Sequence, residues 1–307
     1  MSAAAFVAPS VTPPPNCKPK SYHAYNFLAV FNPKYGKKPK FVPIYLENCV
    51  KQPPVFSSYG NSMPVLYRLV DVKNGIDTLV EVKLRTPVMK SVWGISAGPK
   101  KQEEKDKKPR FTLSLSYDQH TAEGAAYFEL RKDLDDLAVS WAAEDGGRWY
   151  SNVPNEIKMG AVTISKGDYI AGMFMGVTRA RVTTDKTTGE QRTYAPQENH
   201  AVKQKAGKFP VFCAFDSIGA PIDPLTITRD AVVQSLSLTK GLYFMPKQWG
   251  WSIELVQAQK LADGVLTECV MGSDDDEFIP VSNAHQAEPV EKPASAFEQD
   301  GFMSDGN

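Results

Sequence analysis

The clearest alternation of hydrophobic and polar residues lies in residues 241–261, GLYFMPKQWGWSIELVQAQKL. Large apolar residues recur at a spacing of two on one side of this stretch: Trp249, Trp251, Ile253 and Leu255. Ser252 and Glu254 fall on the opposite side. A spacing of two is typical of a strand with one buried and one solvated face, so the segment predicts a long β-strand.

A second extended run, Tyr243 to Met245, precedes this strand, and Pro246 separates the two. Lys247 lies in the break, so aromatic rings and a positive charge share one predicted hairpin. Such rings can stack on nucleobases beside a cation that contacts phosphate. Aromatic residues are also common in strand cores, so the pattern leaves both roles open for each ring.

Shorter apolar runs, separated by clusters of Pro, Gly and Asn, continue along the rest of the chain and predict a β-rich domain. They are AYNFLAVF (24–31), KFVPIYL (40–46), MPVLYRLVDV (63–72), DTLVEVKL (77–84), RFTLSLSYD (110–118), YIAGMFMGVTRARVTT (169–184) and FPVFCAFDS (209–217). In the run at 169–184, the alternation predicts that Arg179 and Arg181 lie on the same side of one strand.

One segment, residues 121–145, has the spacing of three and four that is typical of an amphipathic helix. Its apolar positions are Tyr127, Leu130, Leu134, Leu137 and Trp141. Thr121 can cap the start of the helix, and Gly146 and Gly147 can end it. Seven acidic residues against two basic ones give the helix a net charge of −5, so we expect it to lie away from any polyanion. We also expect Asp135 and Asp136 to be solvated.

The two ends of the chain differ from this patterned middle. Residues 1–20 are rich in Ala and Pro and predict a disordered arm, while residues 273–307 predict a disordered acidic tail. Residues 274–307 hold nine acidic residues and one lysine, a net charge of −8. Because the formal net charge of the chain is zero, residues 1–273 carry +8. We therefore expect a basic β-rich domain over residues 21–272, tethered to the acidic tail.

The sequence also argues against several classes of protein. No apolar run is long enough to span a bilayer, and the first residues lack the pattern of a signal peptide, so we expect an intracellular protein without a membrane partner. The four cysteines and four histidines are scattered, which predicts a reducing compartment, no disulfide and no metal site. No nucleotide-binding, protease or hydrolase motif occurs, so we expect no catalytic residues, no cofactor and no enzyme activity.

Cations and aromatic residues recur close together in the basic part of the chain, as in proteins that bind single-stranded nucleic acid without sequence preference. The candidate binding residues are Lys90, Trp93, Arg110, Arg148, Trp149, Tyr150, Arg179, Arg181, Lys240, Tyr243, Lys247 and Trp249. The lysine-rich segment SAGPKKQEEKDKKPR (96–110) is either a solvated connection between strands or a flexible basic finger that contacts phosphate.

Five segments, in order, resemble a family of single-stranded-DNA-binding-like proteins encoded by nucleocytoplasmic large DNA viruses. They are RTPVMKSVWG (85–94), FTLSLS (111–116), LRKDLDDLAVSWAAEDGGRWY (130–150), DKTTGE (185–190) and GLYFMPKQWGWSIELVQAQ (241–259). The resemblance covers about residues 79–261 and departs from the family pattern at TYAPQENHAVKQKAGKFPV (193–211), where this chain has extra residues.

The resemblance implies a mainly β (α+β) fold, with an oligonucleotide-binding-type β-barrel, added strands and one long amphipathic helix. It also implies single-stranded DNA binding in viral DNA replication or repair, at a viral replication site in the nucleus or cytoplasm of a host cell. RNA is an alternative ligand, and self-association is a further option. The acidic tail, which contains Phe297 and Phe302, is similar to the tails of bacterial single-strand-binding proteins and would contact replication proteins; alternatively, it serves solubility.

A second function from another class fits the same sequence features. A β-sandwich virion or scaffold protein would also be β-rich, non-enzymatic and equipped with terminal arms. Binding of single-stranded oligonucleotides with an affinity that depends on length would distinguish the two.

Overall fold

The computed structural model describes residues 11–31, 38–57, 60–97, 111–145, 157–159, 162–164, 173–184, 188–202, 213–245 and 248–264. The chain divides into two units, residues 1–265 and 266–307, and all described residues lie in the first. The predicted acidic tail and residues 1–10 of the predicted arm fall outside the described residues. Residues 11–20 correct the prediction of a disordered arm, because Val11 is buried and the Thr12 N–H donates a hydrogen bond to the Val70 carbonyl, 3.1 Å away.

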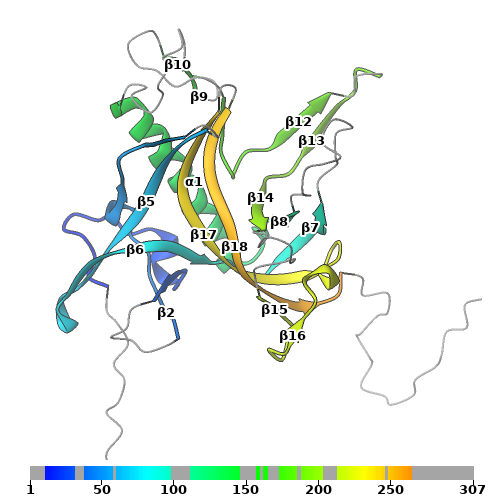
Figure 1. Ribbon diagram of the computed structural model, residues 1–307, viewed down its shortest axis with the longest axis horizontal. Coiled ribbons are helices and arrows are strands. Elements are labelled where there is room, and N and C mark those ends of the chain that lie inside the picture. Colours follow the sequence, from blue (N-terminus) through cyan, green and yellow to red (C-terminus); the bar gives the residue numbers. More distant parts are fainter. Residues whose placement is uncertain are drawn as a thin grey trace, which may run out of the picture. The chain divides into compact units, whose positions relative to one another are not determined.

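The described part of the chain is mainly β, with one long α-helix (Figure 1). The first strands are β1 (Leu28–Val30), β2 (Lys40–Val42), β3 (Cys49–Lys51), β4 (Val55–Ser57), β5 (Gly60–Asp71), β6 (Ile76–Arg85), β7 (Met89–Ala97) and β8 (Phe111–Ser116). After the helix α1 (Ala122–Asp145) come β9 (Ile157–Met159), β10 (Val162–Ile164), β11 (Met173–Met175), β12 (Arg181–Thr184), β13 (Gln191–Tyr194), β14 (Gln197–Val202), β15 (Cys213–Phe215), β16 (Pro221–Ile222), β17 (Val232–Met245) and β18 (Gln248–Ala262). Short 3-10 turns are η1 (Ser21–Ala24), η3 (Leu46–Asn48), η4 (Val72–Asn74) and η6 (Pro224–Thr226).

Two long antiparallel strands, β17 and β18, hold the sheet together. Along its length β17 also pairs with β7, then β6, then β5. On the other side, β18 pairs with β14, which pairs with β8, and β8 pairs with β7. The pairing returns from β7 to β17, but β14 meets β18 in a single register pair, Ala201 with Glu254, so the described strands form no clear closed barrel. β12 and β13 form a separate two-stranded sheet.

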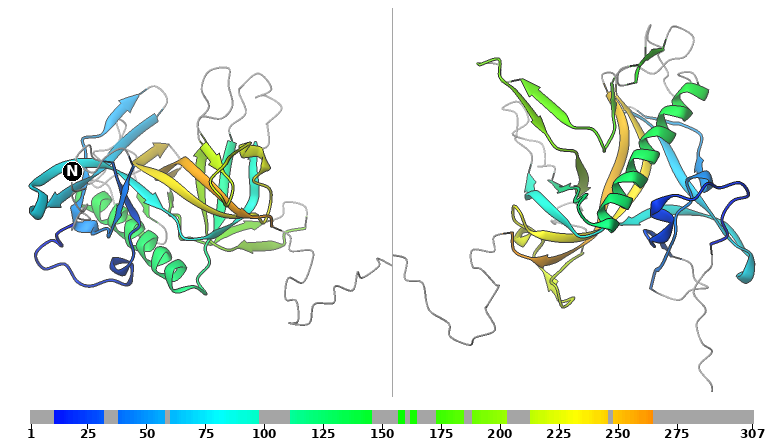
Figure 2. Two further views of the ribbon diagram at one scale, coloured as in Figure 1. Left: turned by 90° about the horizontal axis from the view of Figure 1, so that it is seen from below. Right: turned by 180° about the vertical axis from the view of Figure 1, so that it is seen from behind.

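The helix covers one face of β17 and β18 (Figure 2). It begins at Ala122, as its spacing predicts, and the Thr121 side chain accepts a hydrogen bond from the Gly124 N–H. Tyr127, Leu130 and Leu134 are buried against the sheet, so the predicted apolar stripe is confirmed. Asp135 is a correction, because its side chain is buried rather than solvated; only Asp136 is exposed.

A buried ionic cluster lies between the helix and the sheet. Arg131 on α1 and Glu198 on β14 form an ion pair, with a 3.0 Å bond from Arg131 Nε to Glu198 Oε2. His200 Nε2 lies 2.8 Å from Glu198 Oε1, and Arg131 Nη1 donates to Thr239 Oγ1 on β17 at 3.1 Å. Burial by itself would raise the pKa of Glu198, but Arg131 and His200 outweigh it and lower this pKa to about 2. Arg131 therefore ties α1 to β14 through the ionised Glu198 carboxylate and to β17 through Thr239.

Candidate nucleic-acid interface

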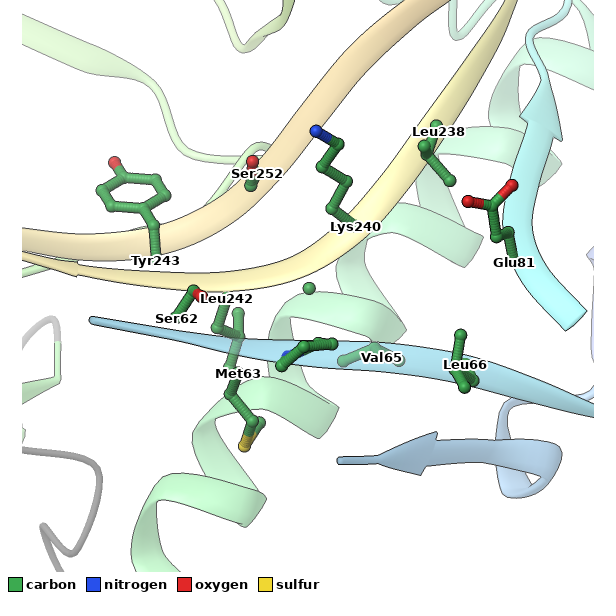
Figure 3. Close-up of a pocket in the computed structure, with 12 residues that line it drawn as sticks. Ser62, Met63, Val65, Leu66, Glu81, Leu238, Lys240, Leu242, Tyr243 and Ser252 are labelled. Atoms are coloured by element: carbon green, nitrogen blue, oxygen red, sulfur yellow. The ribbon is translucent and has the colours of Figure 1, made fainter. Parts of the chain in front are cut away.

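The face of β17 and β18 that points away from α1 is the best candidate for a binding surface. Leu242, Phe244 and Trp249 turn toward the core, while Tyr243 is half-buried on the other face. Figure 3 shows Tyr243 and Lys240 projecting to the side opposite Met63. Alternation along β17 turns Tyr243 away from Leu242 and Phe244. Lys240 lies on the same side as Tyr243 because the register of β17 shifts between Thr239 and Gly241.

Two hollows lie on this face, and both are lined by Tyr243 and Ser252. Figure 3 shows residues that line the first hollow. The first has a volume of about 420 Å³ and is lined by residues of β5, β6, β17 and β18 that include Pro64, Leu66, Glu81, Leu238 and Lys240. The second has a volume of about 510 Å³ and is lined by residues of β8, β11, β14 and β18 that include Thr112, Met175, Asn199, Ala201 and Gln248. An aromatic ring thus stands between two adjoining hollows in a surface built mainly from regular strands.

A β-bulge places Lys240 at the first hollow. The register of β17 against β18 shifts between Thr239 and Gly241. Gly241 has φ of +139°, and a Cβ there would lie 2.1 Å from the Met63 carbonyl oxygen, so only glycine fits. The Lys240 ammonium group pairs with Glu254 at 2.5 Å, but 43% of the Lys240 side chain remains exposed. The Glu254 side chain is only 12% exposed, so the pair is half-buried. Because an ammonium group has three donors, the exposed part of Lys240 can contact a phosphate while it stays paired with Glu254.

A second exposed aromatic residue, Trp93, lies on β7. Its side chain is 52% exposed, and the Arg229 guanidinium carbon lies 5.5 Å from the centroid of its ring. The ladder between β7 and β8 is irregular from Ser91 to Ile95. Gly94 has φ of +75°, and a Cβ there would lie 2.7 Å from the Ile227 carbonyl oxygen. The bulge therefore depends on glycine and leaves the indole ring in solvent beside a cation.

Asp135 of α1 holds the turn that leads into β12. Its carboxylate accepts hydrogen bonds from Thr178 N–H at 3.1 Å and Thr178 Oγ1 at 2.8 Å, and from the Val177 N–H. Burial raises the pKa of Asp135, although these hydrogen bonds oppose the rise. The turn corrects the prediction that Arg179 and Arg181 share one strand, because Arg179 precedes β12 and Arg181 begins it.

The structure sorts the predicted binding residues into groups. Tyr243 and Lys240 line the same hollow, and Lys90 and Trp93 are both exposed on β7. Arg179 is exposed, with its guanidinium carbon 5.8 Å from the Phe174 ring centroid. The side chain of Arg181 is not described, and the remaining candidates lie outside the described residues: Arg110, Arg148, Trp149, Tyr150 and Lys247.

Trp249 is a correction to the predicted site. Its side chain is fully buried, with its ring centroid 4.4 Å from that of Phe174 and 6.1 Å from that of Phe244. In this structure no face of the indole is available to stack on a base, so Trp249 belongs to the core.

Sequence analysis missed two residues that the structure places at these sites. Arg229 lies in a turn without an aromatic neighbour in sequence, and only folding brings it to Trp93. Glu81 lies on β6, and nothing in the sequence indicates that its side of the strand borders a hollow. Both depend on contacts between distant segments, which periodicity within one segment does not reveal.

Comparison with known proteins gives partial structural likenesses. No family model matches the chain, and no curated protein matches it by sequence. Among solved structures, the single-stranded DNA-binding protein from bacteriophage Enc34, in complex with single-stranded DNA, is 12% identical, with a TM-score of 0.33 over 68% of this chain and 94% of that chain. The gp2.5 single-stranded DNA-binding protein encoded by bacteriophage T7 is 11% identical, with a TM-score of 0.35 over 70% of this chain and 100% of that chain. TM-scores this low do not establish a shared fold.

Proposed function

We propose that the chain binds single-stranded DNA on the face of β17 and β18 that points away from α1. The observation that carries this proposal is the pair of hollows that meet at Tyr243. A flexible strand can place successive bases in neighbouring hollows and stack one of them on the ring between, which duplex DNA cannot do because its bases are already stacked and paired.

Cations on and beside the described strands support DNA binding, at the first hollow and at a separate place on β7. Lys240 lines the first hollow, and its ammonium group has donors left for a phosphate beside its ion pair with Glu254. Lys90, Trp93 and Arg229 add two cations and an exposed ring on and beside β7. Stacking between bases and aromatic rings tolerates any sequence, so we expect binding without strong sequence specificity.

Finer parts of the proposal rest on the sequence. We propose that β17, β18, β14, β8 and β7 form an oligonucleotide-binding-type barrel that is partly open between β14 and β18. We also propose that binding serves viral DNA replication or repair. We further propose that the acidic tail contacts replication proteins and competes with DNA for the basic domain. RNA remains an alternative ligand, and self-association along the DNA an additional property.

Fluorescence anisotropy with labelled oligonucleotides of increasing length tests the proposal. We expect affinity to rise with length, single strands to bind more tightly than duplexes, and affinity to fall steeply between about 50 and 200 mM salt as counterions are released. Tyr243→Ala should weaken binding. Tyr25→Ala is a matched control, since Tyr25 is also half-buried but stacks on Phe27, which in turn contacts Tyr127 of α1.

Two results would contradict the proposal. One is an affinity that does not depend on oligonucleotide length, which the virion or scaffold alternative predicts. The other is an equal effect of Tyr243→Ala and Tyr25→Ala on DNA binding at unchanged stability, which would place the binding surface elsewhere.

A further inference from the structure

We infer that the hollow between β5, β6 and β17 is a nucleobase pocket that favours bases carrying an exocyclic amino group over thymine. The inference rests on the proposed function, since it assigns a role to one part of the proposed DNA-binding face.

The hollow exists because three strands part at one point. The ladder between β17 and β5 ends at Gly241 and Pro64, and the ladder between β17 and β6 ends at Thr239 and Val82. Lys240 lies between these two ladders. Farther along, β5 and β6 pair with each other, beginning at Leu66 and Glu81. The backbone of three paired strands therefore frames the opening, which makes it a built feature and not a gap in a loop.

The lining of the hollow suits a flat heterocycle. Leu66 and Leu238 provide apolar surface, and the Tyr243 ring stands at the rim. Glu81 supplies a carboxylate beside Leu238, as Figure 3 shows. At about 420 Å³ the hollow lies within the size range of small-ligand sites, which are mostly apolar with a few placed polar groups.

The charges around the hollow identify the occupant as a base of a DNA strand and not a free apolar ligand. Lys240, 43% exposed at the rim, can contact the phosphate of a nucleotide whose base enters the hollow. Tyr243 is shared with the second hollow, so the next base along a strand has its own place. An apolar ligand would use neither Lys240 nor Glu81.

Glu81 gives the pocket its selectivity. A carboxylate only accepts hydrogen bonds, so it can accept from the N4 amino group of cytosine or the N6 amino group of adenine. Thymine presents its O4 acceptor at the same edge and would meet the carboxylate unfavourably. Lys83 pairs with Glu81 at 2.6 Å, but a carboxylate has about four acceptor positions, so the pair leaves room for a base.

The test compares oligo-dC with oligo-dT of equal length, two pyrimidine strands that differ at the edge Glu81 would read. We measure their affinities by anisotropy for the full chain, for Glu81→Gln and for Asp77→Asn. Asp77 is a matched control, because it lies on the same strand, is exposed, and is ion-paired with Arg68 at 2.7 Å, yet it does not line the hollow. Both variants remove one negative charge.

For the full chain we expect oligo-dC to bind about fivefold more tightly than oligo-dT. Glu81→Gln should bring this ratio close to one, because a glutamine amide can also donate to thymine O4. Asp77→Asn should tighten binding of both strands alike and keep the ratio. Leu66→Trp, which fills the hollow, should also remove the ratio, with melting temperature measured to confirm that the variant is folded.

The measurements distinguish failure of the proposed pocket from failure of the proposed DNA binding. Equal affinities for oligo-dC and oligo-dT in the full chain, or a ratio that survives Glu81→Gln, would refute the pocket and leave DNA binding intact. Failure to bind either oligonucleotide would refute the proposed function itself, and the pocket with it.

Discussion

Trp249 and Tyr243 lie on opposite faces of the hairpin formed by β17 and β18, so replacing Trp249 with alanine should lower stability, whereas replacing Tyr243 should weaken DNA binding. Trp249 is fully buried and packs on Phe174 and Phe244. Removing a buried aromatic side chain of this kind costs about 3 to 5 kcal/mol of unfolding free energy. For a domain of this size, each kcal/mol lowers the melting temperature by about 2 to 4 °C, so Trp249→Ala should lower it by about 6 to 20 °C.

Tyr243 is half-buried at the junction of the two hollows, so Tyr243→Ala should lose less stability but weaken DNA binding by about 1 to 3 kcal/mol per stacked base. Thermal melts followed by circular dichroism and anisotropy titrations at a temperature where both variants are folded separate the two effects. The reasoning fails if Trp249→Ala melts like the unchanged protein and loses DNA binding, because the indole would then act at the interface. It also fails if Tyr243→Ala leaves affinity unchanged.

Three further predictions concern the buried ionic cluster at Glu198, the β-bulge at Gly241 and the acidic tail. The pKa of Glu198 is lowered to about 2 from 4.5, so its ionised form stabilises the fold above about pH 4.5, and this stabilisation is lost as pH falls toward 2. In urea unfolding over this range, the free energy of unfolding should depend less on pH for Glu198→Gln than for the unchanged protein. Equal pH dependence would contradict the ion pair. Gly241→Ala should lower the free energy of unfolding in urea more than Gly75→Ala does. Both residues have positive φ, but a Cβ at Gly75 meets nothing within 4 Å. Equal losses of unfolding free energy would show that β5 can move aside. Deleting residues 274–307 removes a net charge of −8 and should tighten DNA binding at low salt, whereas unchanged or weaker binding would argue against competition by the tail.

The sequence alone predicted several elements correctly. The spacing of two along residues 249–255 identified the buried side of β18, and Trp249, Trp251 and Ile253 are indeed buried. The spacing of three and four identified α1, together with its Thr121 cap. These patterns are local: each element must present one apolar face to a core, whichever segments supply that core.

Other features depended on which segments meet. The sequence contains five tryptophans, and the local pattern does not distinguish those that are exposed and can stack on bases from those that are buried in the core. Trp93 is exposed because a glycine bulge turns it outward. Trp249 is buried because β11 pairs with its strand and the rings of Phe174 and Phe244 pack on the indole. Likewise, the pattern placed Asp135 on a solvated surface, but the turn at Thr178 covers it and satisfies its oxygens.

The difference between features that the sequence predicts and features that only the tertiary structure decides has a physical reason. Periodicity within a segment specifies how side chains alternate between two faces, and this alternation is set by backbone geometry alone. Whether the polar face meets water, a buried partner or a hollow is decided by strand pairing over long sequence separations. Arg131 contacts Glu198 because β14 packs beside the earlier helix α1. Leu238 lines a hollow with Leu66 and Glu81 because β17 pairs with the earlier strands β5 and β6. The sequence thus determined the strands and the helix, and the tertiary structure decided which of their faces can bind.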